Sequence, residues 1–299
     1  MRCKLFVPGS RPELFDKAAA GDADGLSFDL EDAVDESRKD DARQWVGRWI
    51  QERSPQSGKL LVVRVNGMDT PHFEADVDAV VRPGLGMINL PKPRDPDAVR
   101  AACDTIERAR RRHDVPAPVG LLVNIETPRN LREAAALATA HTGVAGLQLG
   151  LGDLFEPYQI HRREPCAVQH AMMVVRMAAA EANIPAWDSA YGNFRDMAHL
   201  ADEAALARRL GFAGKSAIHP SQVAVINEAF RPTADDIAHA ARVIASARVA
   251  KAEGKGAWQV DGRMIDAPFV MRALGVAQTA KRLGLWPAGA AATVEEERP

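Results

Sequence analysis

Charged side chains follow nearly all of the β-rich runs in this sequence, and most of them are acidic. In a parallel barrel the carboxyl ends of the strands meet at one rim, where active sites lie. Several carboxylates buried at one rim are unfavourable unless a cation compensates them, and carboxylate oxygens select a hard ion. Mg²⁺ takes one or two protein carboxylates and fills its shell with water and substrate oxygens, so Glu126 and Asp153 would suffice. The predicted rim residues are Asp29, Glu31, Asp32, Arg64, Lys92, Glu126, Asp153 and Asp188.

Each of these residues also has an ordinary structural interpretation. An acid after a strand can cap the next helix or pair with an arginine, and this holds for Glu126 and Asp153 as well. Arg64, in VRVN, needs a buried anionic partner because its charge is permanent, and that partner is either a structural carboxylate or a substrate. Lys92 stands between two prolines, as part of a rigid turn or as a partner of the acids, and His219 is interpreted as structural.

The N-terminal segment RCKLFVPGSRPELFDKAA combines a strand, a turn and a helix that we expect to begin near Pro12, with Ser10 as its N-cap. The amide groups of a helix start, together with Arg11 and Lys17, could bind a phosphate-bearing ligand. The sequence contains no Walker A loop, no GxGxxG after a strand and no GxSxG elbow. It therefore gives no support for ATP, nicotinamide or serine hydrolase chemistry.

The elements that must position these residues alternate between strand and helix. Ala- and Arg-rich segments such as 131–140 and 172–182 separate the runs, and parallel strands need such crossovers. Eight units of this kind predict an α/β protein with a (β/α)₈ TIM barrel, and an open doubly wound sheet is the alternative. The predicted strands are 3–7, 25–29, 60–66, 86–90, 119–125, 146–150, 184–188 and 214–218.

The chain continues past the eighth predicted strand. Helical stretches are expected at 234–253 and 269–283, on either side of a Gly-rich break, GKGAWQVDGRMIDAP. We therefore predict a barrel over residues 1–230, a C-terminal helical extension over 231–285 and a flexible tail over 286–299.

The composition narrows the class of protein. Of 299 residues, 46% are hydrophobic and 26% charged, which is typical of a soluble globular chain, and the net charge of −2 disfavours nucleic-acid binding. Cys3, Cys103 and Cys166 form no CxxC pair, and we see neither a secretory leader nor an apolar run long enough to span a membrane. A cytoplasmic enzyme without membrane or nucleic-acid partners is expected.

Eight motifs then appear in a recognisable order, and the chain from Arg2 to Leu283 resembles the citrate lyase β-subunit-like (CitE-like)/malyl-CoA lyase branch of the HpcH/HpaI aldolase superfamily. The resemblance implies a lyase that cleaves or forms a 3-hydroxyacyl-CoA such as malyl-CoA, citramalyl-CoA or citryl-CoA, with acetyl-CoA and a 2-oxo acid as the other partners. It also implies Mg²⁺, with Mn²⁺ as the alternative ion, and a homotrimer or hexamer. The motifs are LFVPGSRPELFDKA, FDLEDAV, VRVNG, LPKP, NIET, LGLGD, GFAGKSAIHPSQV and VDGRMIDAP.

The resemblance assigns roles motif by motif. Glu126 of NIET and Asp153 of LGLGD match metal ligands, and Arg64 of VRVNG matches an arginine that holds oxo-acid oxygens and supports catalysis. Asp266 of MIDAP matches an aspartate that is donated across the subunit interface as an acid/base group, and its alternative role is a helix N-cap. Three further substrate-binding positions, which contact CoA, are Phe6, Arg11 and Lys17.

The segment after Asp153 departs from the family pattern. It reads LFEPYQIHRREPCAVQHAMMVVRM, with Glu156, His161 and Arg162, where many relatives have ADLG and then a Tyr-Ala-Arg motif. Because this segment shapes the pocket, the oxo acid stays open. The alternatives are a CoA-independent class II pyruvate aldolase, an acyl-CoA thioesterase on the same scaffold, and a non-catalytic subunit that works with a carrier protein.

Overall fold

The structure, a computed structural model, describes residues 1–287, and its contacts divide the chain into a unit from Met1 to Phe230 and a second unit that starts at Arg231. The first unit holds a closed barrel of eight strands in the order of the sequence, and all neighbouring strands are parallel. The eighth strand pairs with the first, which confirms the (β/α)₈ barrel and excludes the open sheet. The strands are β1 (Cys3–Pro8), β2 (Gly25–Asp29), β3 (Leu60–Arg64), β4 (Leu85–Leu90), β5 (Gly120–Ile125), β6 (Val144–Leu149), β7 (Ala186–Asp188) and β8 (Gly214–Ala217).

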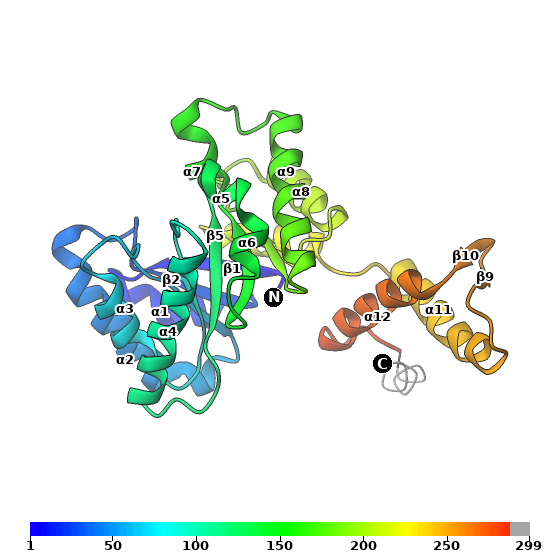
Figure 1. The fold of residues 1–299 in the computed structure, drawn as a ribbon, viewed down its shortest axis with the longest axis horizontal. Helices are drawn as coiled ribbons and strands as arrows, with labels where there is room; N and C mark the ends of the chain where they lie inside the picture. Colours follow the sequence, from blue (N-terminus) through cyan, green and yellow to red (C-terminus); the bar gives the residue numbers. More distant parts are fainter. Residues whose placement is uncertain (288–299) are drawn as a thin grey trace. The chain divides into compact units, whose positions relative to one another are not determined.

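Helices follow the strands along the chain, and in the first unit they lie on the outside of the barrel, with α2, α3 and α4 next to one another (Figure 1). Their starts follow ordinary capping rules: the Asp95 side chain accepts from the Ala98 amide at 2.9 Å, and Thr127 accepts from the Asn130 amide at 3.1 Å. The helices are α1 (Phe15–Ala19), α2 (Lys39–Ser57), α3 (Phe73–Val80), α4 (Pro96–Arg112), α5 (Pro128–Arg132), α6 (Ala134–Ala138), α7 (Leu151–Phe155), α8 (Pro165–Glu181), α9 (Met197–Arg209) and α10 (Ser221–Ala229), with 3₁₀ turns η1 (Pro12–Leu14), η2 (Glu36–Arg38) and η3 (Glu156–Tyr158).

The strand side chains form two layers because successive residues point to opposite faces. Those facing outward pack against the helices in one large core. Those facing inward include a separate apolar cluster, which we call the lumen plug, of Val62, Met87, Leu122 and Trp187. The Trp187 indole donates to the carbonyl oxygen of Met1 at 3.1 Å, so the plug lies toward the N-terminal end of the barrel.

One lysine also points into the lumen. Lys4 is fully buried, its ammonium lies 4.8 Å from the centre of the Phe6 ring, and its Nζ has no hydrogen-bond partner among residues 1–287. Burial first, and the nearby Arg64 charge second, lower the pKa of Lys4 to about 7.

The N-terminal segment differs from the expected helix. A 3₁₀ turn occupies Pro12–Leu14, and α1 begins only at Phe15. Ser10 is not the N-cap: Arg11 takes that position without a capping side-chain bond, and the Ser10 hydroxyl donates to the Ala33 carbonyl at 3.4 Å. A 3₁₀ turn followed by a five-residue helix therefore stands where we expected one continuous helix.

The second unit consists of α11 (Ala234–Ala252), an antiparallel hairpin of β9 (Trp258–Val260) and β10 (Arg263–Ile265), and α12 (Ala267–Arg282) around its own apolar core. The hairpin replaces the expected Gly-rich break. Its turn holds Asp261 and Gly262 at φ of 52° and 75°, which is the Asp-Gly turn that hairpins favour. The predicted tail falls, from residue 288 onward, outside the described residues.

Among the described residues, no helix combines the length and the apolar character that a membrane span requires.

Candidate active site

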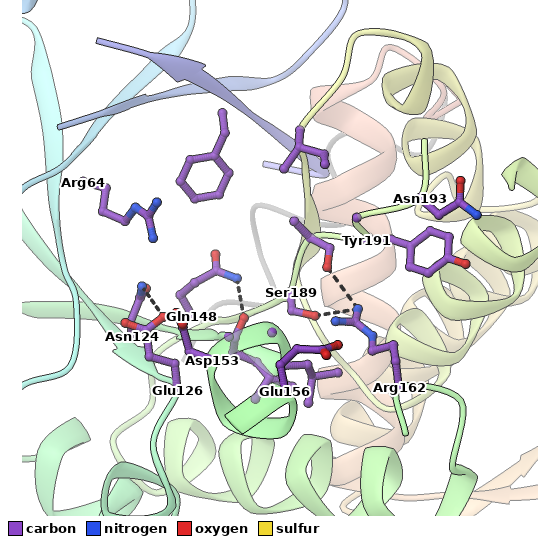
Figure 2. A pocket seen from close by; sticks show the side chains of 18 residues that line it. Arg64, Asn124, Glu126, Gln148, Asp153, Glu156, Arg162, Ser189, Tyr191 and Asn193 are labelled. Atoms are coloured by element: carbon purple, nitrogen blue, oxygen red, sulfur yellow. Dashed lines mark hydrogen bonds between the residues drawn. The ribbon is translucent and has the colours of Figure 1, made fainter. Parts of the chain in front are cut away.

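A cavity of about 440 Å³ opens at the C-terminal ends of the barrel strands (Figure 2). Arg64 ends β3, Glu126 directly follows β5, and Gly150 follows β6, so three strands deliver these residues to one rim. The remaining wall comes from the loop after β7 and from the segment around Arg162. The lining side chains that Figure 2 labels are Arg64, Asn124, Glu126, Gln148, Asp153, Glu156, Arg162, Ser189, Tyr191 and Asn193.

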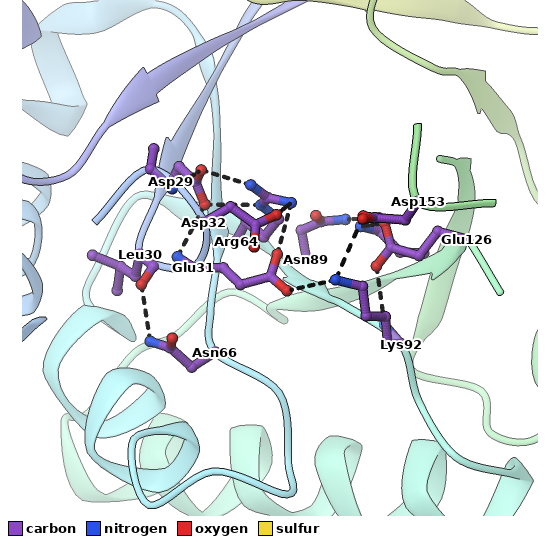
Figure 3. A network of polar contacts seen from close by, with 12 residues as sticks. Asp29, Leu30, Glu31, Asp32, Arg64, Asn66, Asn89, Lys92, Glu126 and Asp153 are labelled. Atoms are coloured by element: carbon purple, nitrogen blue, oxygen red, sulfur yellow. Dashed lines mark hydrogen bonds and ion pairs between the residues drawn. The ribbon is translucent and has the colours of Figure 1, made fainter. Parts of the chain in front are cut away.

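Arg64 is held by carboxylates on every side (Figure 3). Its Nε and Nη2 donate to the two oxygens of Asp29 at 2.8 and 2.6 Å, while Nη1 lies 2.7 Å from Glu31 and 3.2 Å from Asp32. Burial alone would lower the pKa of Arg64, but the hydrogen bonds and charge of Asp29 raise it. Of the two partners that the sequence left open, the structure contains the structural carboxylate.

Glu126 is a carboxylate in a tight cradle. Its side chain accepts from the Lys92 amide and from the Asn124 side chain, each at 3.1 Å, and the residue is 2% exposed. A Cβ at Gly150 would lie 2.7 Å from Glu126 Oε2, so only glycine leaves the carboxylate its place. Burial, and then the charge of Glu31, raise the pKa of Glu126.

Asp153 lines the same cavity but does not end a strand. β6 stops at Leu149, and Asp153 lies on α7 with 41% of its side chain exposed. Lys92 connects it to the other acids, because its Nζ lies 3.5 Å from Asp153 and 3.4 Å from Glu31. With φ at 42°, Lys92 is also the residue of a tight turn, so both of its expected roles are met.

These side chains form one group, which we call the acidic cluster, and its carboxylates outnumber its cations. No group of three or more Asp, Glu, His and Cys side chains surrounds a metal position in residues 1–287. A buried carboxylate with room beside it and a second, half-exposed one nevertheless fit Mg²⁺, which fills most of its octahedron with water and substrate oxygens. The members are Asp29, Glu31, Asp32, Arg64, Lys92, Glu126 and Asp153.

Asp188 does not belong to that cluster, although we expected it at the rim. Its neighbour Trp187 points into the lumen, so Asp188 points outward, where it accepts from the fully buried Lys215 at 2.6 Å. Lys215 also donates to Glu203 at 2.8 Å, and Glu203 in turn accepts from Arg162. Burial raises the pKa of Glu203, but Lys215 and Arg162 outweigh it and lower the value to about 2. We call these four residues the ion-pair network.

The ion-pair network fixes the loop after β7, which the sequence did not identify as part of the site. Arg162 donates to the Ser189 hydroxyl at 2.9 Å and to the Ala190 carbonyl at 3.0 Å, and it lies 5.9 Å from the Tyr191 ring centre. No strand-end rule predicts residues that two loops bring together. The one available signal was the unusual composition of the segment that contains Arg162.

The remaining predicted residues fall in different places. Phe6 lines the cavity, with the Arg64 guanidinium 5.3 Å from its ring centre. Arg11 is exposed and pairs with Glu13 at 2.8 Å, and Lys17 is exposed on α1, so neither lines the cavity. His219 stacks on the exposed Phe194, with ring centres 4.9 Å apart.

Asp266 belongs to the second unit. It takes the N-cap position of α12, yet its side chain makes no capping bond. Among the described residues its Oδ1 is buried without a hydrogen-bond partner. The structural alternative of a helix cap is therefore not realised by its side chain.

Comparison with known proteins identifies the family. The chain is 34% identical to citrate lyase subunit beta of Leuconostoc mesenteroides subsp. cremoris over 93% of each chain. It is 33% identical to an L-malyl-CoA/beta-methylmalyl-CoA lyase (94% of this chain, 95% of the relative) and 33% identical to a (3S)-malyl-CoA thioesterase (91% and 92%), both of Cereibacter sphaeroides.

A solved structure agrees. CitE from Mycobacterium tuberculosis, in complex with magnesium, acetoacetate and coenzyme A, superposes with a TM-score of 0.73 at 30% identity, over 94% of this chain and 98% of that one. The model of the HpcH/HpaI aldolase/citrate lyase family matches residues 2–220, which include the whole barrel rim. The predicted resemblance is confirmed: this chain is an enzyme that belongs to the HpcH/HpaI aldolase/citrate lyase family.

Proposed function

We propose that this enzyme is a Mg²⁺-dependent carbon–carbon lyase. It would cleave or form a 3-hydroxyacyl-CoA such as malyl-CoA, citramalyl-CoA or citryl-CoA, with acetyl-CoA and a 2-oxo acid as products. The observation that carries the proposal is the cradled carboxylate of Glu126 beside Asp153 in a cavity whose acids outnumber its cations. Lyases among the relatives, and a related structure with magnesium and coenzyme A, support it.

Glu126 and Asp153 would hold the metal, with Mn²⁺ as the alternative ion. A bound divalent ion polarises hydroxyl and carboxylate oxygens and lowers the pKa of the hydroxyl group. Glu126 suits this task because its raised pKa reflects an uncompensated buried charge, which a cation would relieve.

Arg64 would act by its charge. Asp29 fixes two of its nitrogens, so a substrate oxygen can approach only at Nη1, in competition with Glu31 and Asp32. In the cleavage direction the hydroxyl proton leaves to solvent at the rim, and the electrons of the broken carbon–carbon bond form the thioester enolate. A guanidinium nearby stabilises that negative charge. Asp266 of a neighbouring subunit would then protonate the enolate carbon and release acetyl-CoA.

This role of Asp266 requires an oligomer, for which we propose the trimer or hexamer expected from the family, with residues 231–285 reaching over a neighbour's cavity. Phe6 would contact the CoA chain, and Arg11 and Lys17 the CoA phosphates. Both cations are exposed and so available to a ligand from outside the cavity. The cytoplasmic location stays a prediction.

A thioesterase is the second candidate, favoured by the malyl-CoA thioesterase relative. The same cavity could direct water to the thioester carbonyl in place of carbon–carbon cleavage. The two reactions differ in their products: a lyase gives acetyl-CoA and an oxo acid, and a thioesterase gives free CoA and an intact hydroxy acid.

The test is an assay of the purified enzyme with malyl-CoA, citramalyl-CoA and citryl-CoA, with Mg²⁺ or EDTA, in which acetyl-CoA, free CoA and oxo acid are all measured. Metal-dependent acetyl-CoA and oxo acid are expected. Free CoA with intact hydroxy acid would replace the proposal by the thioesterase. Absence of turnover with all three esters would contradict both and favour a carrier-bound acyl group or a CoA-independent aldolase.

A further inference from the structure

Two cations line the cavity, and they differ in what their nitrogens already bind. All three guanidinium nitrogens of Arg64 face carboxylates. Arg162 donates only from Nε and Nη2, and its Nη1 makes no hydrogen bond to any of the described residues 1–287. Of the two cations, Arg162 is therefore the one whose Nη1 can still donate a hydrogen bond to a ligand.

The guanidinium of Arg162 is also held rigidly. Glu203 accepts from Nε at 3.2 Å and from Nη2 at 3.1 Å, and Nη2 reaches Ser189 and Ala190 besides. In Figure 2 this group points toward Ser189, in the part of the view opposite Arg64. A cation that is fixed before a ligand arrives loses little side-chain entropy on binding it.

Glu156 is the acidic side chain that could occupy this donor instead, because it lines the cavity with Arg162. It does not: no ion pair joins the two among the described residues, and Glu156 is exposed. The free donor thus faces either water or a ligand.

We propose that Arg162 is a specificity-determining residue, whose Nη1 binds a second carboxylate on the oxo-acid part of the substrate. The preferred oxo acid would then be a dicarboxylate such as oxaloacetate, in preference to pyruvate or glyoxylate, which lack that group. Guanidinium and carboxylate match in geometry and charge, and a cavity of about 440 Å³ accommodates a four-carbon diacid. The inference rests on the proposed function for the reaction, but its test needs only binding.

The experiment is calorimetric titration of the Mg²⁺-loaded enzyme with freshly dissolved oxaloacetate and with pyruvate. Wild type should bind oxaloacetate more tightly. Arg162→Met should weaken oxaloacetate binding by about 10- to 100-fold, the range expected for one charged hydrogen bond, and leave pyruvate binding nearly unchanged. Arg162→Lys, which keeps the charge, should fall between them, and it serves if the methionine variant does not fold.

Arg163→Met is the matched control. Arg163 holds the same loop through Tyr191 and Asp196, but it does not line the cavity, so this variant should keep the preference for oxaloacetate. Equal losses for both oxo acids in Arg162→Met and Arg163→Met would overturn the proposal and leave Arg162 a loop anchor. So would a wild type that does not prefer oxaloacetate. An Arg162-dependent preference in an enzyme that cleaves no CoA ester would uphold this inference and refute the proposed function.

Discussion

The acidic cluster and the ion-pair network border the same cavity, but they differ in net charge: the first has an excess of carboxylates and the second is balanced. The acidic cluster gathers more carboxylates than its two cations, Arg64 and Lys92, can neutralise. The ion-pair network matches Arg162 and Lys215 with Glu203 and Asp188. Unbalanced negative charge calls for a cation from outside, whereas a balanced network can hold one guanidinium ready for an anion. The charge balance of the two groups thus favours a metal ion at the acidic cluster and an anionic part of the substrate at the ion-pair network.

The largest effect is expected from Lys215→Met, which leaves Asp188 and Glu203 buried without their shared cation. The free energy of unfolding should fall by about 3–5 kcal/mol, because breaking one partner out of a buried ion pair leaves an uncompensated charge. Urea denaturation monitored by circular dichroism measures this. A loss below about 1 kcal/mol would show that water or another group replaces Lys215 and that the network is not a closed unit.

Glu126→Gln tests the acidic cluster. Removing this carboxylate should lower kcat/KM on the order of 10³-fold, as loss of a central charge at a reaction site does, and weaken Mg²⁺ binding. Steady-state kinetics and Mg²⁺ titration check both. Glu107→Gln, at a half-exposed acid on α4 far from the rim in the sequence, is the control and should have the kcat/KM and Mg²⁺ affinity of wild type. Unchanged Mg²⁺ binding in Glu126→Gln would remove Glu126 from the metal site.

Lys4→Met asks whether a cation in the lumen balances the acidic cluster. Burial lowers the pKa of Lys4 to about 7, so the folded protein binds this proton less tightly than the unfolded chain does. Its charged form therefore costs stability at and below pH 7, and the cost disappears as pH rises toward the ordinary value of 10.5. Lys4→Met should stabilise by about 2 kcal/mol at pH 6 and by less at pH 10. Destabilisation at both pH values would mean that Lys4 has a compensating partner.

Lys92→Met should give the smallest change in stability. Lys92 is 39% exposed and its ion-pair distances are 3.4 and 3.5 Å, so the free energy of unfolding should change by less than about 1 kcal/mol. Thermal or urea unfolding of Lys92→Met and Lys215→Met compares the stability contributions of the acidic cluster and the ion-pair network directly. Similar losses in the two variants would contradict the difference between an open cluster and a closed network.

The sequence predicted the barrel well, and the site only in part. Buried parallel strands form continuous apolar runs, so all eight strands were found, with small shifts at their ends. Glu126 was placed at the rim for the same reason. Asp188 was misplaced because its position depends on which face of β7 it occupies, and a three-residue strand does not reveal that. Asp153 lies on a short helix that the strand-end rule does not foresee.

Arg162 and the loop after β7 could not be assigned from the sequence. Their proximity depends on Glu203 and Lys215, which lie far along the chain on α9 and β8. The hairpin of the second unit is different, since the Asp261-Gly262 pair between β-rich residues is a local hairpin signal in the sequence.

The lumen plug has a kinetic consequence. Val62, Met87, Leu122 and Trp187 fill the barrel toward its N-terminal end, so a ligand reaches the cavity from the C-terminal ends of the strands. In the proposed reaction both products leave at this same end, and the metal at Glu126 and Asp153 would hold the oxo acid but not the thioester. Acetyl-CoA should therefore depart first and the oxo acid second. Product-inhibition patterns would show this as an ordered release, with the oxo acid competing for the free enzyme.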